Sequence, residues 1–320
     1  MKKVNYIEIV LLFFLSVLLF FSSIHTLPVL DRDEARYAQA SRQMIEQNDF
    51  INIKFQEEYR SKKPIGIYWI QTTFVQLFSS IKKDDAKVYN ILKDNIWKYR
   101  FTSSLGGLIS ILIIYFLTQN LFGRKTAFYS ALILASGLLF IIESHIAKTD
   151  AFLLTVSILV MALLAGYYTG YYTKKKDFRF FLLWFAVSIS ILIKGPVLPL
   201  IMLMTIIALV ILNRDYNWLK NTQPFLGLII IISINIPWFL FMPAEQFNNF
   251  FYEGIKQDFF GKLVKAQESH NAFFGAHFLS LWVLFFPMSF FLIPLFYSLK
   301  KSYKNKKVTF LLAWILPSFF

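Results

Sequence analysis

The stretch IEIVLLFFLSVLLFFSSIHTLPVLDRDEARYAQASRQMIEQNDF, residues 7–50, joins an apolar run directly to a polar, charged one. Its first part, residues 7–27, is long and apolar enough to cross a bilayer as a helix. The charged start Lys2-Lys3 resembles that of a signal peptide, but the apolar run exceeds a typical signal core and no A-x-A-like cleavage site follows. We therefore predict a retained first membrane helix that leads into an external polar segment.

The whole chain has the composition of a membrane protein. Of its 320 residues, 57% are hydrophobic and 19% aromatic, while only 16% are charged. Soluble proteins of this length rarely reach such values. Cysteine is absent, which excludes disulfides and thiolate chemistry. Further apolar segments long enough to span lie at 101–119, 126–143, 150–172, 180–194, 196–212, 224–241 and 272–298, and a last one starts near 308. The sequence thus predicts an all-α polytopic membrane protein.

The formal net charge of +14 would suit a nucleic-acid partner, but the positions of the charges favour a membrane topology instead. Lys and Arg are in excess in the cytoplasmic loops of membrane proteins. If the amino terminus is cytoplasmic, the cytoplasmic loops contain Lys2-Lys3, Arg124-Lys125, Lys174 to Lys176 with Arg179, Arg214 with Lys220, and the basic run from Lys300 to Lys307. We expect this orientation, and no nucleic-acid partner.

Two loops, about 28–100 and 242–271, are too long and too polar to be simple connectors. The predicted topology places both on the external face, where membrane enzymes carry their chemistry above a scaffold of helices. We treat residues 1–320 as one transmembrane domain. It finishes with VTFLLAWILPSFF, partway into an apolar segment too short to span. We therefore expect either a re-entrant tail or a truncated version of something longer.

The polar half of the opening stretch has helical spacing, with Asp31 or Asp33 as its N-cap and acids in its first turn. That structural role alone would account for Asp33 and Glu34. A functional alternative follows from Asp33, Arg36 and Tyr37, which stand at i, i+3 and i+4 and share one face. A carboxylate and a guanidinium together at a membrane surface suit an enzyme that handles a phosphorylated lipid. The DRD triplet also fits the D-x-D pattern of metal-dependent nucleotide-sugar sites, but that pattern is very common.

A second helix is expected within EEYRSKKPIGIYWIQTTFVQLF, residues 57–78. Pro64 suits the first position of a helix, and Lys62 and Lys63 would precede it where backbone amides favour an anion. The segment could equally be a membrane-surface helix with solvated lysines, Tyr68 and Trp69 lying at headgroup depth.

Two further positions combine charge with a membrane boundary. Asp150 opens a predicted helix on the external side, where it either caps the helix with Thr149 or lines a cavity. Lys194-Gly195-Pro196 breaks the apolar run 180–212, either as a hairpin with a snorkelling lysine or as part of a donor site. The four histidines are too scattered for a metal-ligand motif.

Taken together, the motifs of the first loop resemble those of the bacterial aminoarabinose-transferase-like glycosyltransferases, which group with the protein mannosyltransferases in the GT-C class. The matching residues are Asp33-Glu34, Arg36-Tyr37-Ala38, Asp49-Phe50, Lys63-Pro64 and Tyr68-Trp69. The resemblance extends through SHIAKTDAFLL (144–154), ILIKGPVLP (191–199) and GKLVKAQESHNAFFGAHFL (261–279).

The resemblance implies a GT-C-type transmembrane helix bundle with external amphipathic loop helices. It implies a transferase that moves a sugar from an undecaprenyl-phosphate carrier to a lipid A, cell-envelope or protein acceptor at the outer face of the inner membrane. Membrane lipid, the polyprenyl-phosphate-sugar donor and a lipid or glycan acceptor are the implied partners. By position it assigns catalytic roles to Asp33 and Asp150, carrier-phosphate binding to Arg36, Lys63 and Lys262, and supporting roles to Glu34, Tyr37 and His270.

Some departures from the family pattern leave alternatives open. Some members carry an acid just before Lys-Pro and hold a divalent metal partly through it; here that position is Lys62, so metal dependence stays open. Members also usually continue with more helices and a soluble carboxy-terminal domain. Two other readings are therefore kept: a truncated inactive remnant of such an enzyme, and a polytopic transporter or flippase, for which paired broken helices in repeated halves are expected.

Overall fold

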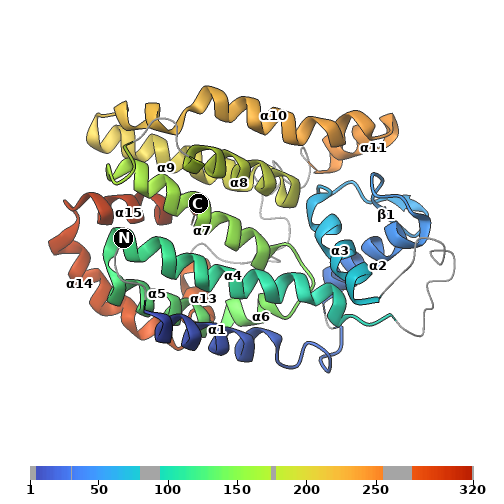
Figure 1. Cartoon of the computed structure of the whole chain (residues 1–320), viewed down its shortest axis with the longest axis horizontal. Coiled ribbons are helices and arrows are strands. Elements are labelled where there is room, and N and C mark those ends of the chain that lie inside the picture. Colours follow the sequence, from blue (N-terminus) through green and yellow to red (C-terminus); the bar gives the residue numbers. More distant parts are fainter. Residues whose placement is uncertain (1–4, 30, 80–93, 174–177, 255–275, 319–320) are drawn as a thin grey trace.

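Long apolar helices lie side by side along most of the molecule (Figure 1). This computed structural model describes residues 5–29, 31–79, 94–173, 178–254 and 276–318. The main bundle consists of α1 (Tyr6–Phe21), α4 (Trp97–Phe122), α5 (Arg124–Ser136), α6 (Leu138–Ser144), α7 (Asp150–Tyr168), α8 (Phe178–Lys194), α9 (Val197–Asn213), α10 (Pro224–Phe241) and α15 (Lys306–Ser318). Shorter elements complete it: the 3-10 helices η3 (Asn217–Thr222) and η5 (Met288–Phe291), and the helices α11 (Ala244–Asn249), α13 (Ala276–Leu284) and α14 (Leu292–Ser302).

A smaller polar unit projects from one end of the bundle (Figure 1). It contains α2 (Arg32–Gln47), a two-stranded antiparallel hairpin of β1 (Lys54–Phe55) and β2 (Glu58–Tyr59), and α3 (Gly66–Ser79). Gln43 ties α2 to the hairpin through two bonds with the Gln56 backbone, of 2.8 and 2.7 Å. Ser41 donates to Gln71 at 2.7 Å and so joins α2 to α3. These buried side-chain bonds make the unit a defined platform rather than an open loop.

Helix α4 packs against α7 through small and hydroxyl-bearing residues. Gly106 brings the two backbones together, since a Cβ there would meet the Phe152 Cα at 3.0 Å. Thr155 of α7 donates to the Gly106 carbonyl at 2.7 Å and shares a 2.9 Å hydrogen bond with Ser110. Small residues and hydroxyl bonds are how helices associate in lipid, where the surrounding chains are as apolar as Leu.

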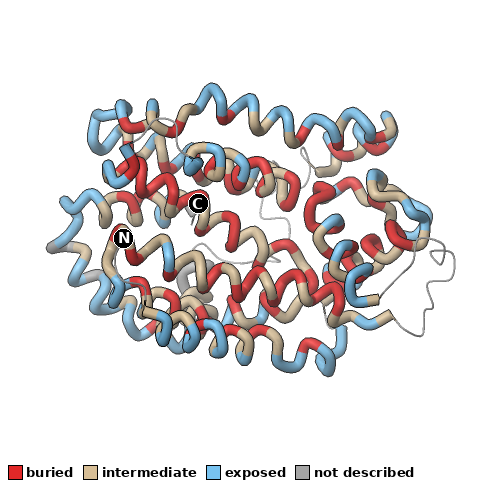
Figure 2. The backbone as a smooth tube through the Cα atoms, viewed as in Figure 1, coloured by how far each residue is buried: buried red, intermediate tan, exposed pale blue. Residues whose placement is uncertain are grey.

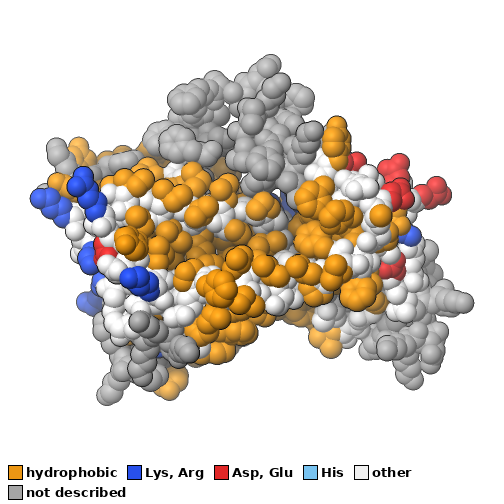
Figure 3. Space-filling view, turned by 90° about the horizontal axis from the view of Figure 1, so that it is seen from above, with side chains coloured by type: hydrophobic (Ala, Val, Ile, Leu, Met, Phe, Trp, Pro, Cys, Tyr) orange, Lys and Arg blue, Asp and Glu red, His pale blue; other side chains and the backbone are white. Residues whose placement is uncertain are grey.

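The structure confirms a mostly helical, multi-pass membrane protein. Among the described residues, α4, α7 and α10 are each long and apolar enough to cross a bilayer, and the pair α5 and α6, bent by 66°, counts as a fourth span. Exposed positions gather on the outer faces of α1 and α10 (Figure 2), which are almost entirely apolar. Such faces suit contact with lipid. Figure 3 shows a band of hydrophobic side chains between an end rich in Lys and Arg and an end that carries Asp and Glu.

Several predicted boundaries are wrong, each for a local reason. The first helix ends at Phe21 rather than near 27, because the chain turns at Ser22 and Ser23, the latter with φ of 63°. The predicted span 126–143 bends at Gly137, between α5 and α6. The predicted span 272–298 is not one helix: within the described residues it divides around Pro287 into α13, η5 and α14. Its residues 272–275 lie outside the described ranges.

Helix α3, which was expected within residues 57–78, also differs from its prediction. It begins at Gly66, two residues after Pro64, and Tyr68 is fully buried rather than at headgroup depth. Tyr68 is buried because it packs against the Tyr37 ring of α2 and accepts a hydrogen bond from Arg60. The hairpin of β1 and β2 was not predicted, because strands of two residues leave no readable alternation.

Gly66→Ala is expected to lower the free energy of unfolding by about 1–3 kcal/mol, because overpacking forces a backbone shift. A Cβ at this position would lie 2.7 Å from the Leu192 backbone oxygen, which cannot rotate away. Thermal unfolding of the purified protein in detergent measures the effect. Gly137→Ala is the matched control, since its Cβ would meet nothing closer than 3.4 Å and its φ is −66°. Equal melting temperatures for the two variants would contradict the close contact.

Candidate functional site

The first turn of α2 is fixed by Asp31, which the structure shows to be the N-cap. Its Oδ1 accepts from the amides of Asp33 at 2.6 Å and Glu34 at 3.2 Å. Its Oδ2 pairs with the Lys148 ammonium at 2.5 Å, which ties α2 to the turn before α7. Burial acts to raise the pKa of Asp31, but Lys148 and the two amides outweigh it and hold the pKa below its ordinary value. Asp31 therefore stays charged at neutral pH and serves structure.

Asp33 is thereby freed from capping and faces outward. Its Oδ1 accepts from the Arg36 guanidinium at 3.2 Å, one turn along the helix. The Asp33 side chain is 53% exposed and that of Arg36 is 37% exposed. The predicted shared face is thus confirmed for this pair, and both groups remain accessible to a ligand.

Tyr37, the third residue of the predicted face, is buried behind them. Its ring lies 5.5 Å from the Tyr68 ring, and the Arg60 guanidinium lies over it at 5.1 Å. Arg60 also donates to the Tyr68 hydroxyl at 2.9 Å. Burial raises the pKa of Tyr37 well above its ordinary value, and the charges of Tyr68 and Asp150 add to this against Arg60. Both phenols therefore stay neutral, as hydrogen-bonding groups rather than bases.

Asp150 joins this cluster from the start of α7. It forms an ion pair with Lys194, the last residue of α8, and accepts from Thr149 at 3.4 Å. Asp150 and Thr149 both influence the pKa of the Tyr37 phenol, Asp150 raising it and Thr149 lowering it. Gly195 follows with φ of 69°, which confirms the predicted hairpin at this turn. Since Asp33 acts on Arg60, which lies over the Tyr37 ring, and Asp150 acts on Tyr37, the Asp33–Arg36 and Asp150–Lys194 pairs belong to one region.

Glu34, unlike its exposed neighbour Asp33, is buried (1% exposed) and forms an ion pair with Arg100 of α4. Arg100 donates to the two Glu34 oxygens at 2.7 and 2.9 Å. Its other N–H groups reach the carbonyls of Ile24, Leu27 and Pro28 at 2.7 to 3.1 Å. Glu34 also accepts from the Ala147 amide at 2.9 Å. This clamp holds the α1–α2 connection, α2, α4 and the turn before α7 in one arrangement.

Of the other predicted site residues, the structure describes Lys63 but not Lys262 or His270. Lys63 is half-buried and Lys62 exposed at the approach to α3. Gly254, beyond α11, comes close to this approach, since a Cβ on it would lie 2.8 Å from the Ser61 carbonyl oxygen. Lys262 and His270 lie outside the described residues, so their predicted roles stay predictions.

The two carboxylates of the DRD triplet have separate partners. Asp31 is engaged by two amides and Lys148, and Asp33 by Arg36. Within the described part of the chain, no three His, Cys, Asp or Glu side chains are grouped to hold a metal ion.

Sequence reasoning missed Arg60 and Arg100. The signal for Arg100 is its position directly before the apolar run 101–119, where an ionisable residue needs a partner. Arg60 carries no such signal, because only the fold of the hairpin brings it over Tyr37.

A family model described as dolichyl-phosphate-mannose-protein mannosyltransferase matches residues 62–241, more than half of the chain. The chain belongs to this family. Among curated relatives of this mannosyltransferase-family chain, an uncharacterized protein of Aquifex aeolicus is 27% identical over 290 residues, covering 88% of this chain and 52% of the relative. The undecaprenyl phosphate-alpha-4-amino-4-deoxy-L-arabinose arabinosyl transferase of Yersinia enterocolitica is 25% identical over 237 residues, covering 71% and 40%.

Solved structures agree on the fold of this family member. ArnT from Cupriavidus metallidurans bound to undecaprenyl phosphate superposes with a TM-score of 0.78 at 20% identity, over 97% of this chain and 54% of that one. The oligosaccharyltransferase of Archaeoglobus fulgidus gives 0.59 at 14% identity, over 98% and 45%. The chain therefore spans about half the length of the proteins it matches. These comparisons confirm the predicted GT-C fold and the resemblance to the aminoarabinose-transferase-like enzymes.

Proposed function

We propose that the chain is an integral-membrane glycosyltransferase that moves a sugar from an undecaprenyl-phosphate donor to an acceptor. The supporting observation is the pairing of accessible carboxylates with cations, Asp33 with Arg36 and Asp150 with Lys194, at one end of a GT-C bundle. We place this end at the outer face of a bacterial inner membrane, with the amino terminus in the cytoplasm, because Lys and Arg gather at the opposite end. A lipid A, cell-envelope or protein group is the proposed acceptor.

The proposed reaction is an inverting displacement at the anomeric carbon of the sugar. The acceptor oxygen forms the new bond, the bond between the anomeric carbon and the phosphate oxygen breaks, and undecaprenyl phosphate leaves with the electron pair. The leaving phosphate needs no proton but gains negative charge, which Arg36, Lys63 and Lys262 would stabilise. Asp33 would take the proton of a hydroxyl acceptor, or orient an acceptor that is itself a phosphate.

Lys63→Ala is expected to weaken the binding of undecaprenyl phosphate about tenfold to a hundredfold, the usual loss for one hydrogen bond to a charged group. Titration of the purified chain with the carrier lipid in detergent, followed by native mass spectrometry, measures the affinity. Lys62→Ala is the matched control, since the neighbouring lysine is exposed.

The outcomes separate the alternatives. A wild-type protein that is folded but never binds the carrier would refute the carrier site and favour a transporter. A chain that never gives a folded protein would favour the inactive remnant. Equal losses in Lys62→Ala and Lys63→Ala would remove the specific role of Lys63.

A further inference from the structure

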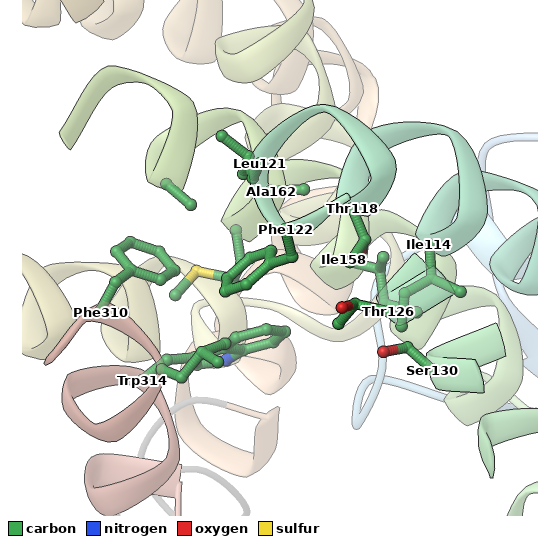
Figure 4. A pocket seen from close by; sticks show the side chains of 13 residues that line it. Ile114, Thr118, Leu121, Phe122, Thr126, Ser130, Ile158, Ala162, Phe310 and Trp314 are labelled. Atoms are coloured by element: carbon green, nitrogen blue, oxygen red, sulfur yellow. The ribbon is translucent and has the colours of Figure 1, made fainter. Parts of the chain in front are cut away.

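A cavity of about 160 Å³ lies at the other end of the bundle from the acidic and basic site (Figure 4). It is lined by the end of α4, the start of α5, the middle of α7 and α15. Phe122, Phe310 and Trp314 present their rings to it, and Ala162 and Ala165 leave room along α7. Thr118 of α4 and Thr126 and Ser130 of α5 are the hydroxyl-bearing residues of an otherwise apolar lining.

The size and lining suit a hydrocarbon. Buried apolar cavities of about 150 Å³ exclude water and accept a molecule such as benzene. This one is also partly open to the outside of the bundle, and two of the helices that line it, α4 and α7, are long and apolar enough to cross a bilayer. A linear acyl chain could enter from the bilayer, and the part of it inside the cavity would add van der Waals contacts to the lining rings.

The rim of the cavity is basic. The Lys307 ammonium donates to the Leu121 carbonyl and lies 5.6 Å from the centroid of the Phe122 ring, so it is adjacent to two lining residues. Lys306 precedes it and is exposed. Lys125, also exposed, lies in the first turn of α5 beside the lining residue Thr126. A further cation at this rim, Arg124, is partly offset by Glu8 at 3.3 Å. The remaining lysines leave an excess of positive charge.

We propose that this cavity holds one acyl chain of an anionic phospholipid, with the lipid phosphate at Lys125, Lys306 and Lys307. Charge complementarity favours an anionic lipid. A lipid without net charge would gain only the apolar contacts of its acyl chain, whereas an anionic headgroup would also be attracted to the lysine ammonium groups. The site is distinct from the carrier region, which lies at the opposite end of α4 and α7.

Trp314 gives a direct probe, because it lines the cavity. The whole chain is reconstituted in phosphatidylcholine nanodiscs that contain a fixed fraction of acyl-brominated phosphatidylglycerol or, separately, acyl-brominated phosphatidylcholine. Bromine quenches indole fluorescence on contact. The difference in quenching between wild type and Trp314→Phe isolates the contribution of this one tryptophan from the others.

We expect the Trp314 contribution to be quenched about fivefold more effectively by the brominated anionic lipid for each lysine that contacts its headgroup. Lys307→Gln should reduce that preference, and Lys306→Gln with Lys307→Gln should remove most of it. Lys220→Gln, at the same end but on η3, should leave it unchanged. Ala162→Phe, which fills the cavity, should lower quenching by both lipids.

Three results would overturn the proposal: equal quenching by the two brominated lipids, a preference undiminished by loss of both Lys306 and Lys307, or quenching unaffected by Ala162→Phe in a protein that still folds. Unlabelled undecaprenyl phosphate provides the last arm. If it relieves quenching at a mole fraction at which unlabelled phosphatidylglycerol does not, the cavity binds the polyprenyl chain and the phospholipid assignment is wrong.

Discussion

Replacing Glu34 with alanine is expected to lower the free energy of unfolding by about 3–5 kcal/mol, which is enough to remove most folded protein from the membrane. The substitution leaves the Arg100 guanidinium buried, 2% exposed, without its counter-ion. It also leaves the Ala147 amide without its acceptor at 2.9 Å. Fluorescence-detected size-exclusion chromatography before and after heating would measure both the yield and the melting temperature.

Two further variants separate this clamp from a general intolerance of α2. Glu46→Ala removes a carboxylate from the same helix, but its partner Arg42 and Glu46 itself are partly exposed, so the expected loss is below about 1 kcal/mol. The double variant Glu34→Leu with Arg100→Met removes both charges and should be more stable than Glu34→Ala alone, because no unpaired buried charge remains. A Glu34→Ala protein as stable as Glu46→Ala would contradict the clamp.

The sequence predicts the long apolar helices well and the breaks between them poorly. Apolar length and composition are summed over many residues, so α4, α7 and α10 were predicted close to their observed bounds. Breaks depend on single residues and on packing. The bend at Gly137 and the division around Pro287 lie inside runs that are apolar throughout, so hydropathy passes over them.

In the candidate site, likewise, contacts within one helix are predictable from the sequence and contacts between distant segments are not. The Asp33–Arg36 pair was predictable because helical spacing alone brings i and i+3 together. Three other ion pairs join segments that are distant in the sequence: Glu34–Arg100, Asp31–Lys148 and Asp150–Lys194. The sequence shows their members only as charges near a membrane boundary. Such charges need partners, but which carboxylate meets which cation depends on how α4, α7 and α8 pack. The same packing decides that Glu34 is structural while Asp33, one residue away, is accessible.

Because Asp33 is accessible whereas Glu34 is buried, a substitution of Asp33 should affect activity rather than folding. Asp33→Asn is expected to reduce sugar transfer by about 10²–10⁴-fold, the usual contribution of a positioned general base, while the protein folds normally. Folding should be spared because the N-cap is Asp31 and the Asp33 side chain is 53% exposed, with Arg36 as its partner. The assay is the initial rate of transfer of labelled sugar from an undecaprenyl-phosphate donor to acceptor in membranes that contain equal amounts of each variant.

The kinetic constants of this variant distinguish the two roles open to Asp33. If Asp33 removes a proton from a hydroxyl acceptor, Asp33→Asn lowers kcat more than it changes KM. If Asp33 only orients a phosphate acceptor, the variant changes KM more than kcat. Glu46→Gln, on the same helix but away from Arg36, should match wild type in both. Full transfer activity in Asp33→Asn would exclude Asp33 from the reaction and leave Asp150, paired with Lys194, as the carboxylate to test.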